Sequence, residues 1–356
     1  MKRILALTTA IGLVSGPALA DVNLLSWGGA YGNSHLQAYA KPFTAETGIA
    51  VHISDADNPA TPIKAQVEAG NVSVDVASVE YADAVRLCDE GLLETIDPAI
   101  LVAAPDGTAA ADDFIDGAIT ECFVATDVYS MVLTYNDRAF GDAKPAAPAD
   151  FFDLATYPGK RTMRKGAKFN LELALMADGV PADQVYDVLA TPEGVDRAFA
   201  KLDTIKSDVI WWEAGAQPPQ LLADGEVSMA YAFNGRIFNA AQADGQPFVI
   251  IWDGQIYEME GWVIPKGAPN IDDTLKFIAW TTSAEPQARA AEFISYGPPR
   301  RSAAAIVGNI EGTDQPMGPN LPTFEANMTN ALGSNLDFWV DHDGQLNERF
   351  NSWLAN

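Results

Sequence analysis

Apolar stretches of five or six residues alternate with amphipathic stretches through the first hundred residues of the chain. The apolar stretches have the length of buried strands, whereas the amphipathic ones carry apolar side chains at helical spacing and end at a glycine. Strands are predicted over 22–27, 49–53 and 74–78, and helices over 34–47, 63–69 and 82–90. Because strands that alternate with helices form parallel sheets covered by helices, the sequence predicts an α/β fold.

A second region repeats this alternation after a β-rich stretch at 128–135, which we expect to cross between two domains. Its predicted strands are 209–212, 227–233, 248–253 and 257–265, and its predicted helices are 171–176, 192–202, 218–223, 272–280 and 284–294. The tail, 322–356, is predicted to be helical, and the strand 227–233 ends at Asn234-Gly235. A chain of 356 residues, 48% of them apolar, has room for two domains and a sizeable core.

The first twenty residues have the organisation of an export signal. Lys2 and Arg3 precede an apolar stretch over 4–14, and Ala18-Leu19-Ala20 supplies the small residues that a signal peptidase recognises. This stretch is too short to cross a hydrocarbon layer of roughly 30 Å. We therefore predict a cleaved signal peptide over 1–20 and an exported, soluble mature protein that begins at Asp21.

Acidic residues outnumber basic ones, with 48 Asp and Glu against 22 Lys and Arg and a net charge of −26. Such a surface repels phosphate, so nucleic-acid binding is excluded. At long range the acidic surface favours cationic or neutral ligands.

Export also determines how the two cysteines are interpreted. In an oxidising compartment we predict that Cys88 and Cys122 form a disulfide, with two buried free thiols as the alternative. His35, His52 and His342 are isolated, so no metal site is predicted.

Motifs of catalysis are missing from the sequence. It contains no G-x-S-x-G or G-x-G-x-x-G, so neither a nucleophilic serine nor a dinucleotide cofactor is predicted. We expect a protein that is not an enzyme and has no cofactor. A secreted hydrolase stays an alternative, because a glycosidase needs only two carboxylates.

Large aromatic residues gather where the predicted strands end. They are Trp27, Tyr31, Tyr81, Trp211, Phe233, Tyr257 and Tyr296. Ligands of open α/β sheets bind beyond the carboxyl ends of strands. Aromatic faces together with a carboxylate form a site for an ammonium group, so a small amine is the predicted ligand.

Six segments carry a resemblance to a known family. They are S-W-G-G-A-Y at 26–31, V-D-V-A-S at 74–78, G-L-L-E-x-I-D at 91–97, V-L-T-Y-N at 132–136, A-D-G-E-V-S-M-A-Y-A-F-N-G at 223–235 and S-Y-G-P-P at 295–299. In this order and spacing they resemble the periplasmic substrate-binding proteins of ABC importers, in the spermidine/putrescine-binding family.

This resemblance implies a type II periplasmic binding protein, with two lobes that each contain a mixed sheet flanked by helices and a ligand in the cleft between them. It implies lobe 1 over 21–130 plus 255–295 and lobe 2 over 131–254 plus 296–356. It also implies a periplasmic monomer that delivers a small amine to an ABC permease in the inner membrane.

The family's polyamine site matches this sequence only in part. The resemblance implies a box of Trp27, Tyr31, Tyr257 and Tyr296 around one ammonium, which pairs with Glu260 or Glu80. Further pocket positions are matched by Ser78, by Tyr81 next to Glu80, and by Phe233 in place of a tryptophan, while Trp211 ends a strand of the second region. The place of a second tryptophan is taken by Glu258.

The far end of the site departs from the family pattern. The two acids that hold the second amine of a polyamine are replaced by Gly166 and Phe169. Around them stand five cations, Lys160, Arg161, Arg164, Lys165 and Lys168. This basic cluster is either a solvated patch that contacts the permease or a carboxylate receptor, in which Arg164 or Arg236 binds the carboxylate.

Several ligand classes therefore stay open. A linear polyamine follows the family name, an ω-amino acid such as γ-aminobutyrate suits the basic cluster, and quaternary amines suit an aromatic box. Ferric-iron binders of the same fold use paired tyrosines, but this sequence contains no Tyr-Tyr pair; Phe151-Phe152 and Trp211-Trp212 are adjacent aromatic residues without a tyrosine.

Overall fold

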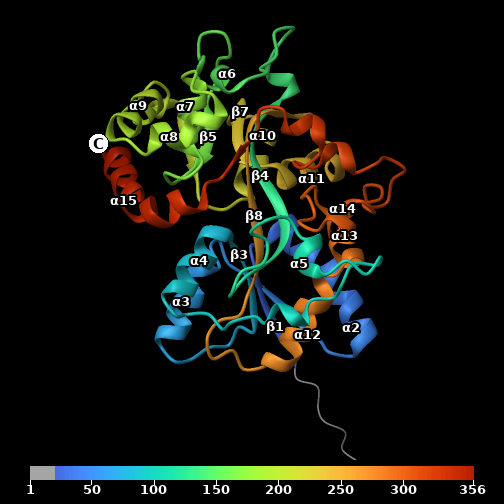
Figure 1. Cartoon of the computed structure of the whole chain (residues 1–356). Coiled ribbons are helices and arrows are strands. Elements are labelled where there is room, and N and C mark those ends of the chain that lie inside the picture. Colours follow the sequence, from blue (N-terminus) through green and yellow to red (C-terminus); the bar gives the residue numbers. More distant parts are fainter. Residues whose placement is uncertain (1–20) are drawn as a thin grey trace, which may run out of the picture.

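The computed structural model describes residues 21–356. The predicted signal peptide over 1–20 lies outside the described residues. Within 21–356, no helix combines the length and apolar character needed to cross a membrane. Two lobes, each with helices packed on a sheet, are joined by the long strands β4 and β8, which run from one lobe into the other (Figure 1). The predicted two-lobed α/β fold is confirmed.

One mixed sheet runs through both lobes. Its strands are β1 (Val22–Ser26), β2 (Val51–Asp55), β3 (Val76–Glu80), β4 (Val124–Asn136), β5 (Arg161–Arg164), β6 (Val209–Trp212), β7 (Met229–Phe233), β8 (Phe248–Val263) and β9 (Leu332–Gly333). Their order is β2-β1-β3-β8-β4-β7-β5-β6, and β9 pairs with β8. Both ends of the sheet are parallel, whereas β4 and β8 pair with antiparallel neighbours at its centre.

Helices cover the sheet in both lobes (Figure 1). They are α1 (Gly29–His35), α2 (Lys41–Thr47), α3 (Ala60–Glu68), α4 (Tyr81–Asp89), α5 (Ala110–Asp113), α6 (Pro148–Phe152), α7 (Asn170–Ala177), α8 (Val185–Leu189), α9 (Pro192–Asp203), α10 (Gln217–Ala223), α11 (Asn234–Ala243), α12 (Ile271–Thr281), α13 (Ala284–Phe293), α14 (Arg301–Ala304) and α15 (Leu336–Ala355). A π-helical turn over 36–40 joins α1 to α2. Gly48 ends α2 with a left-handed φ of 78°, which a glycine adopts without strain.

The strand predicted over 227–233 ends before Asn234-Gly235 as expected, and these two residues begin α11. Two sequence predictions about elements are wrong. The predicted strands 248–253 and 257–265 form one strand, β8, in which the residues between them make a bulge opposite β4. In the tail only α15 is a long helix, because the stretch 322–335 forms a short 3-10 helix and the strand β9.

Each lobe has its own hydrophobic core. Leu24, Val76 and Phe277 are fully buried in one of them, and Leu173 and Tyr231 in the other. The lobe boundaries inferred from the family resemblance stay a prediction, since β4 and β8 contribute to both cores.

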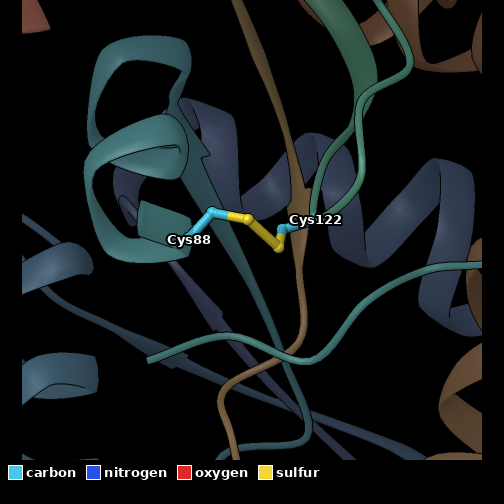
Figure 2. Close-up of a disulfide and its surroundings, with 2 residues drawn as sticks. All are labelled: Cys88 and Cys122. Carbon is cyan, nitrogen blue, oxygen red and sulfur yellow. A yellow bond between two sulfur atoms is a disulfide. The ribbon is translucent and has the colours of Figure 1, made fainter. Parts of the chain in front are cut away.

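The predicted disulfide is present. Cys88, in the last turn of α4, is bonded to Cys122, which precedes β4 (Figure 2). Their Cα atoms are 6.0 Å apart, within the range of native disulfides. The bond ties α4 to the start of the strand that crosses between the lobes.

Candidate functional site

A pocket lies between the lobes, where several strands end and β4 and β8 cross. It encloses about 290 Å³, including space that is open to solvent. Its walls are Trp27, Tyr31, Glu80, Tyr129, Phe233, Arg236, Glu260 and Tyr296. A larger cleft of about 780 Å³ shares Trp27, Phe233 and Arg236 with it and forms an adjoining chamber.

Aromatic rings form most of the pocket wall. The ring centroids of Tyr31 and Tyr296 are 5.5 Å apart, those of Tyr296 and Tyr129 6.2 Å, and those of Tyr129 and Phe233 5.4 Å. These neighbours tilt relative to one another, which fixes the shape of the pocket. The negative faces of such rings attract an ammonium group.

Glu260 provides a carboxylate in this aromatic wall. Its Oε1 accepts hydrogen bonds from Trp27 Nε1 at 2.8 Å and from Ser78 Oγ at 2.9 Å. Burial raises the pKa of Glu260 well above its usual value, and the charges of Asp127 and Glu80 raise it further. Among residues 21–356 it forms no ion pair. A cation that enters the pocket would therefore find a carboxyl group that no cation of the protein pairs with.

Glu80 also lines the pocket, but its charge is already balanced. Its Oε1 accepts a hydrogen bond from Arg164 Nη1 at 2.6 Å, and its Oε2 lies 3.3 Å from Lys168 Nζ. Lys168 also pairs with Glu258 at 2.6 Å. Burial opposes ionisation of Glu80, but the charges of Arg164 and Lys168 outweigh burial and lower its pKa to about 2. Of the two acids predicted to pair with ammonium, only Glu260 lacks such cations.

Arg236 brings a guanidinium to the same pocket from the first turn of α11. Its Nη1 donates to Gly28 O at 3.2 Å and its Nη2 to Trp27 O at 3.1 Å, while its buried Nε has no partner. A Cβ atom at Gly29 or Gly215 would lie 2.7 Å from the guanidinium, so both glycines leave room for it. Arg236 forms no ion pair within 21–356 and can therefore accept a carboxylate.

The basic cluster is divided between three environments. Arg161 is fully buried and donates to the carbonyl oxygens of Phe151, Gly159 and Tyr157. Lys160 and Lys165 are exposed, and Lys165 pairs with Glu213. Arg164 and Lys168 reach Glu80, so the cluster joins two sides of the cleft instead of forming one carboxylate receptor. At the places of the family's far acids, Gly166 lies near Asn347, and Phe169 is buried with a φ of 70°.

Three predicted pocket residues lie elsewhere. The ring of Tyr81 stacks on Phe123 at 5.0 Å, and Tyr257 lies against Gly333 of β9. Trp211 packs against Phe350 and Trp353 in the core of lobe 2. None of the three is among the residues that line the pocket or the adjoining cleft.

Sequence reasoning missed Tyr129, which lies within β4 and not at a strand end. Its hydroxyl donates to Glu258 Oε2 at 3.0 Å, and Tyr129 is the register partner of Glu258. A period-two reading of the crossing strand would have placed Asp127 and Tyr129 on one face. Residues 21–356 contain no cluster of three or more His, Cys, Asp or Glu side chains suited to hold a metal ion.

Comparison with known proteins identifies relatives over nearly the whole chain. The profile of the family described as bacterial extracellular solute-binding protein matches residues 38–320. The γ-aminobutyric acid-binding protein of Pseudomonas aeruginosa is 44% identical over 335 residues, which cover 94% of this chain and 91% of that protein.

Solved structures give the same result. MotA of Agrobacterium tumefaciens B6, in complex with glucopine, is 30% identical with a TM-score of 0.85 and coverages of 94% and 99%. The GABA receptor Atu4243 is 34% identical with a TM-score of 0.78 and coverages of 94% and 98%. A spermidine/putrescine-binding protein of Streptococcus pneumoniae is only 16% identical, which shows a common fold and nothing about ligand.

Proposed function

Because the chain belongs to the bacterial extracellular solute-binding protein family, we propose that it captures γ-aminobutyrate, or a closely similar ω-amino acid, for an ABC importer. One observation carries this proposal: the same aromatic pocket contains a carboxylate, Glu260, and a guanidinium, Arg236, neither of which has an ionic partner in the described chain. A zwitterion with separated charges satisfies both groups.

The ammonium group of the ligand pairs with Glu260 and lies against the rings of Tyr31, Tyr129 and Tyr296. Its carboxylate accepts hydrogen bonds from Arg236, whose Nε is unpartnered. The names of two relatives, a γ-aminobutyric acid-binding protein and a GABA receptor, support the same ligand.

The pocket suits a polyamine less well. A second ammonium at the far end of the pocket would lie beside Arg236, where the pocket wall offers no acid free of cations, and an unpaired buried charge costs several kcal/mol. A quaternary amine would use the rings but would leave Arg236 without a partner. The charged groups of the pocket therefore favour an ω-amino acid over a polyamine and over a quaternary amine.

We place this activity in the periplasm, where the predicted signal peptide would deliver the protein and where the disulfide is stable. The protein acts there as a monomer that binds its ligand, returns it unchanged and presents it to the permease. The predicted lobes close on the ligand, which reaches the pocket through the adjoining cleft.

Calorimetry on residues 21–356 tests the proposal with γ-aminobutyrate, butylamine, putrescine, spermidine and choline. We expect γ-aminobutyrate to bind most tightly. Arg236→Gln should weaken it by at least about 30-fold, since losing one partner of a buried charge pair costs about 2–5 kcal/mol. Butylamine, which has no carboxylate, should bind both proteins equally.

Arg164→Gln is the matched control, because Arg164 already pairs with Glu80. It should reduce γ-aminobutyrate and butylamine binding by the same factor. Tight binding of putrescine with no γ-aminobutyrate binding would contradict the proposed ligand. A loss specific to γ-aminobutyrate in Arg164→Gln, with Arg236→Gln unaffected, would move the carboxylate to Arg164.

A further inference from the structure

Two buried carboxyl groups, one in the aromatic wall and one behind it, are joined by two hydroxyl groups. Asp127 on β4 and Glu260 on β8 are register partners on the crossing strands, which run side by side in Figure 1. The Tyr31 hydroxyl lies 2.7 Å from Asp127 Oδ2 and 3.0 Å from Ser78 Oγ, and Ser78 Oγ lies 2.9 Å from Glu260 Oε1. The four groups form one unbroken chain of hydrogen-bonded oxygens.

When both acids are ionised, the chain has too few protons to form all of its hydrogen bonds. Its three oxygen–oxygen contacts need three protons, whereas Tyr31 and Ser78 carry one hydroxyl proton each. If both hydroxyls donate to the carboxylates, no proton lies in the 3.0 Å contact between Tyr31 and Ser78. One additional proton, on either carboxyl, completes all three hydrogen bonds.

The surroundings of Asp127 allow it to accept that proton. Its Oδ1 is buried without a partner in the described chain, and Thr126 Oγ donates to its Oδ2 at 3.1 Å. Burial raises the pKa of Asp127 to about 7, the hydrogen bonds from Tyr31 and Thr126 only partly opposing this shift.

The titratable groups that face Asp127 from the elements packed around it are Tyr31, His35, Tyr39, Glu260 and Tyr296. Burial lowers the pKa of His35 to about 3 and raises those of the three tyrosines, so all four are neutral near pH 7. Arg289 and Arg236 act on Tyr39 and Tyr296, and neither forms an ion pair with Asp127. Glu260 is thus the group with which Asp127 shares a proton.

We propose that the Asp127–Tyr31–Ser78–Glu260 chain stores one proton, and that the ligand's ammonium group drives this proton from Glu260 to Asp127. This inference rests on the proposed function. In the empty pocket Glu260 donates to Ser78, Ser78 to Tyr31, and Tyr31 to Asp127. On binding, each oxygen passes its proton one place along, so that three O–H bonds break and three form. Asp127 then donates to Tyr31, and Glu260 is the anion that faces the ammonium.

Asp127 is in this account a positioning residue, since it acts on the ligand through Tyr31 and Ser78. The transfer lets a buried carboxyl stay neutral without ligand and become an anion with it, with no proton exchanged with solvent. Two buried acids in contact titrate as a pair, and the ligand decides which of them is ionised.

Infrared difference spectroscopy of the bound minus the free protein tests the transfer at about pH 8, where Asp127 has lost any second proton. With γ-aminobutyrate the wild-type protein should lose one band and gain another in the carbonyl-stretch region of protonated carboxyl groups. The gained band belongs to Asp127 and should be missing in Asp127→Asn. Ser78→Ala, which interrupts the chain and keeps Asp127, should also lack it.

Thr126→Val is the matched control, because it removes a hydrogen bond to Asp127 and leaves the chain intact. It should keep both bands. Calorimetry in buffers of different ionisation enthalpy should find no net proton release for the wild-type protein. Asp127→Asn, which cannot accept the proton of Glu260, should release up to one proton per ligand.

A wild-type spectrum that only loses a band, or that shows no change, would overturn the transfer, as would a gained band that survives in Asp127→Asn. If γ-aminobutyrate still binds in these experiments, such results would contradict the proton transfer but not the proposed ligand. Failure to bind γ-aminobutyrate at all would instead overturn the proposed function and, with it, the ligand-driven transfer.

Discussion

Replacing Glu260 by glutamine removes the carboxylate that would face the ligand's ammonium group and keeps the shape of the pocket. Glutamine still offers an oxygen to Trp27 Nε1 and Ser78 Oγ, which lie 2.8 and 2.9 Å from Glu260 Oε1. An ammonium at a hydrogen-bond distance of about 3 Å from the carboxylate gains about 5 kcal/mol at an effective dielectric constant of about 20. Desolvation reduces this gain to the range of about 2–5 kcal/mol that is typical of buried charge pairs.

That range corresponds to a dissociation constant for γ-aminobutyrate that rises by about 30-fold to about 5,000-fold. Isothermal calorimetry at about pH 8 measures it directly, and thermal unfolding of the free variant establishes that it is folded. Glu258→Gln is the matched control, because it makes the same change two residues away on β8, where the carboxylate already pairs with Lys168. An unchanged affinity in Glu260→Gln, or an equal loss in both variants, would refute the assignment of Glu260 as the ammonium partner.

Three further predictions concern pH and stability. Below about pH 7 Asp127 in the empty pocket takes up a second proton, and this proton must leave when the ligand binds. The affinity for γ-aminobutyrate should therefore fall by up to about tenfold per pH unit, and a dissociation constant that calorimetry finds unchanged from pH 7 to pH 5 would contradict this. Burial raises the pKa of Glu172, which accepts a hydrogen bond from Trp339, to about 7, so folding favours its neutral form and stability is lost as pH rises towards and through that value. Between pH 5 and pH 8 the free energy of unfolding of the wild-type protein, measured with denaturant, should fall by about 1–3 kcal/mol relative to that of Glu172→Gln. A difference between the two proteins that stays constant with pH would refute this. Replacing Cys88 and Cys122 by alanine should lower the free energy of unfolding by about 2–4 kcal/mol, because the disulfide closes a loop between residues separated by 34 positions in the sequence. Neither cysteine lines the pocket, so ligand affinity should stay unchanged, and a large loss of affinity would contradict this.

The features that sequence predicted well depend on local pattern or on compartment. Strand and helix periods are set by near neighbours, which is why the alternation over 22–90 gives the observed order of elements. The disulfide follows from two facts, an export signal and only two cysteines. Trp27 and Phe233 were expected near the ligand because they follow or end strands, and both line the pocket.

The features that sequence did not predict depend on contacts between distant segments. Glu80 and Arg164 are 84 residues apart, and nothing local shows that their ion pair removes Glu80 as a free anion. Arg236 was one of two candidates for the carboxylate, and only the position of α11 shows that its guanidinium reaches the carbonyl oxygens of Trp27 and Gly28. The chain from Asp127 to the pocket is a property of tertiary packing alone.

The charged groups around the cleft therefore divide into two sets with different tasks. Glu80, Glu258, Arg164 and Lys168 neutralise one another across the cleft, so their contacts contribute to holding the lobes together whichever ligand is present. Glu260 and Arg236 have no ionic partner among the described residues, so their burial is offset only by a ligand of opposite charges. Because the two sets use different residues, we expect a substitution at Glu260 or Arg236 to change the ligand preference and to leave the ion pairs of Arg164 and Lys168 in place.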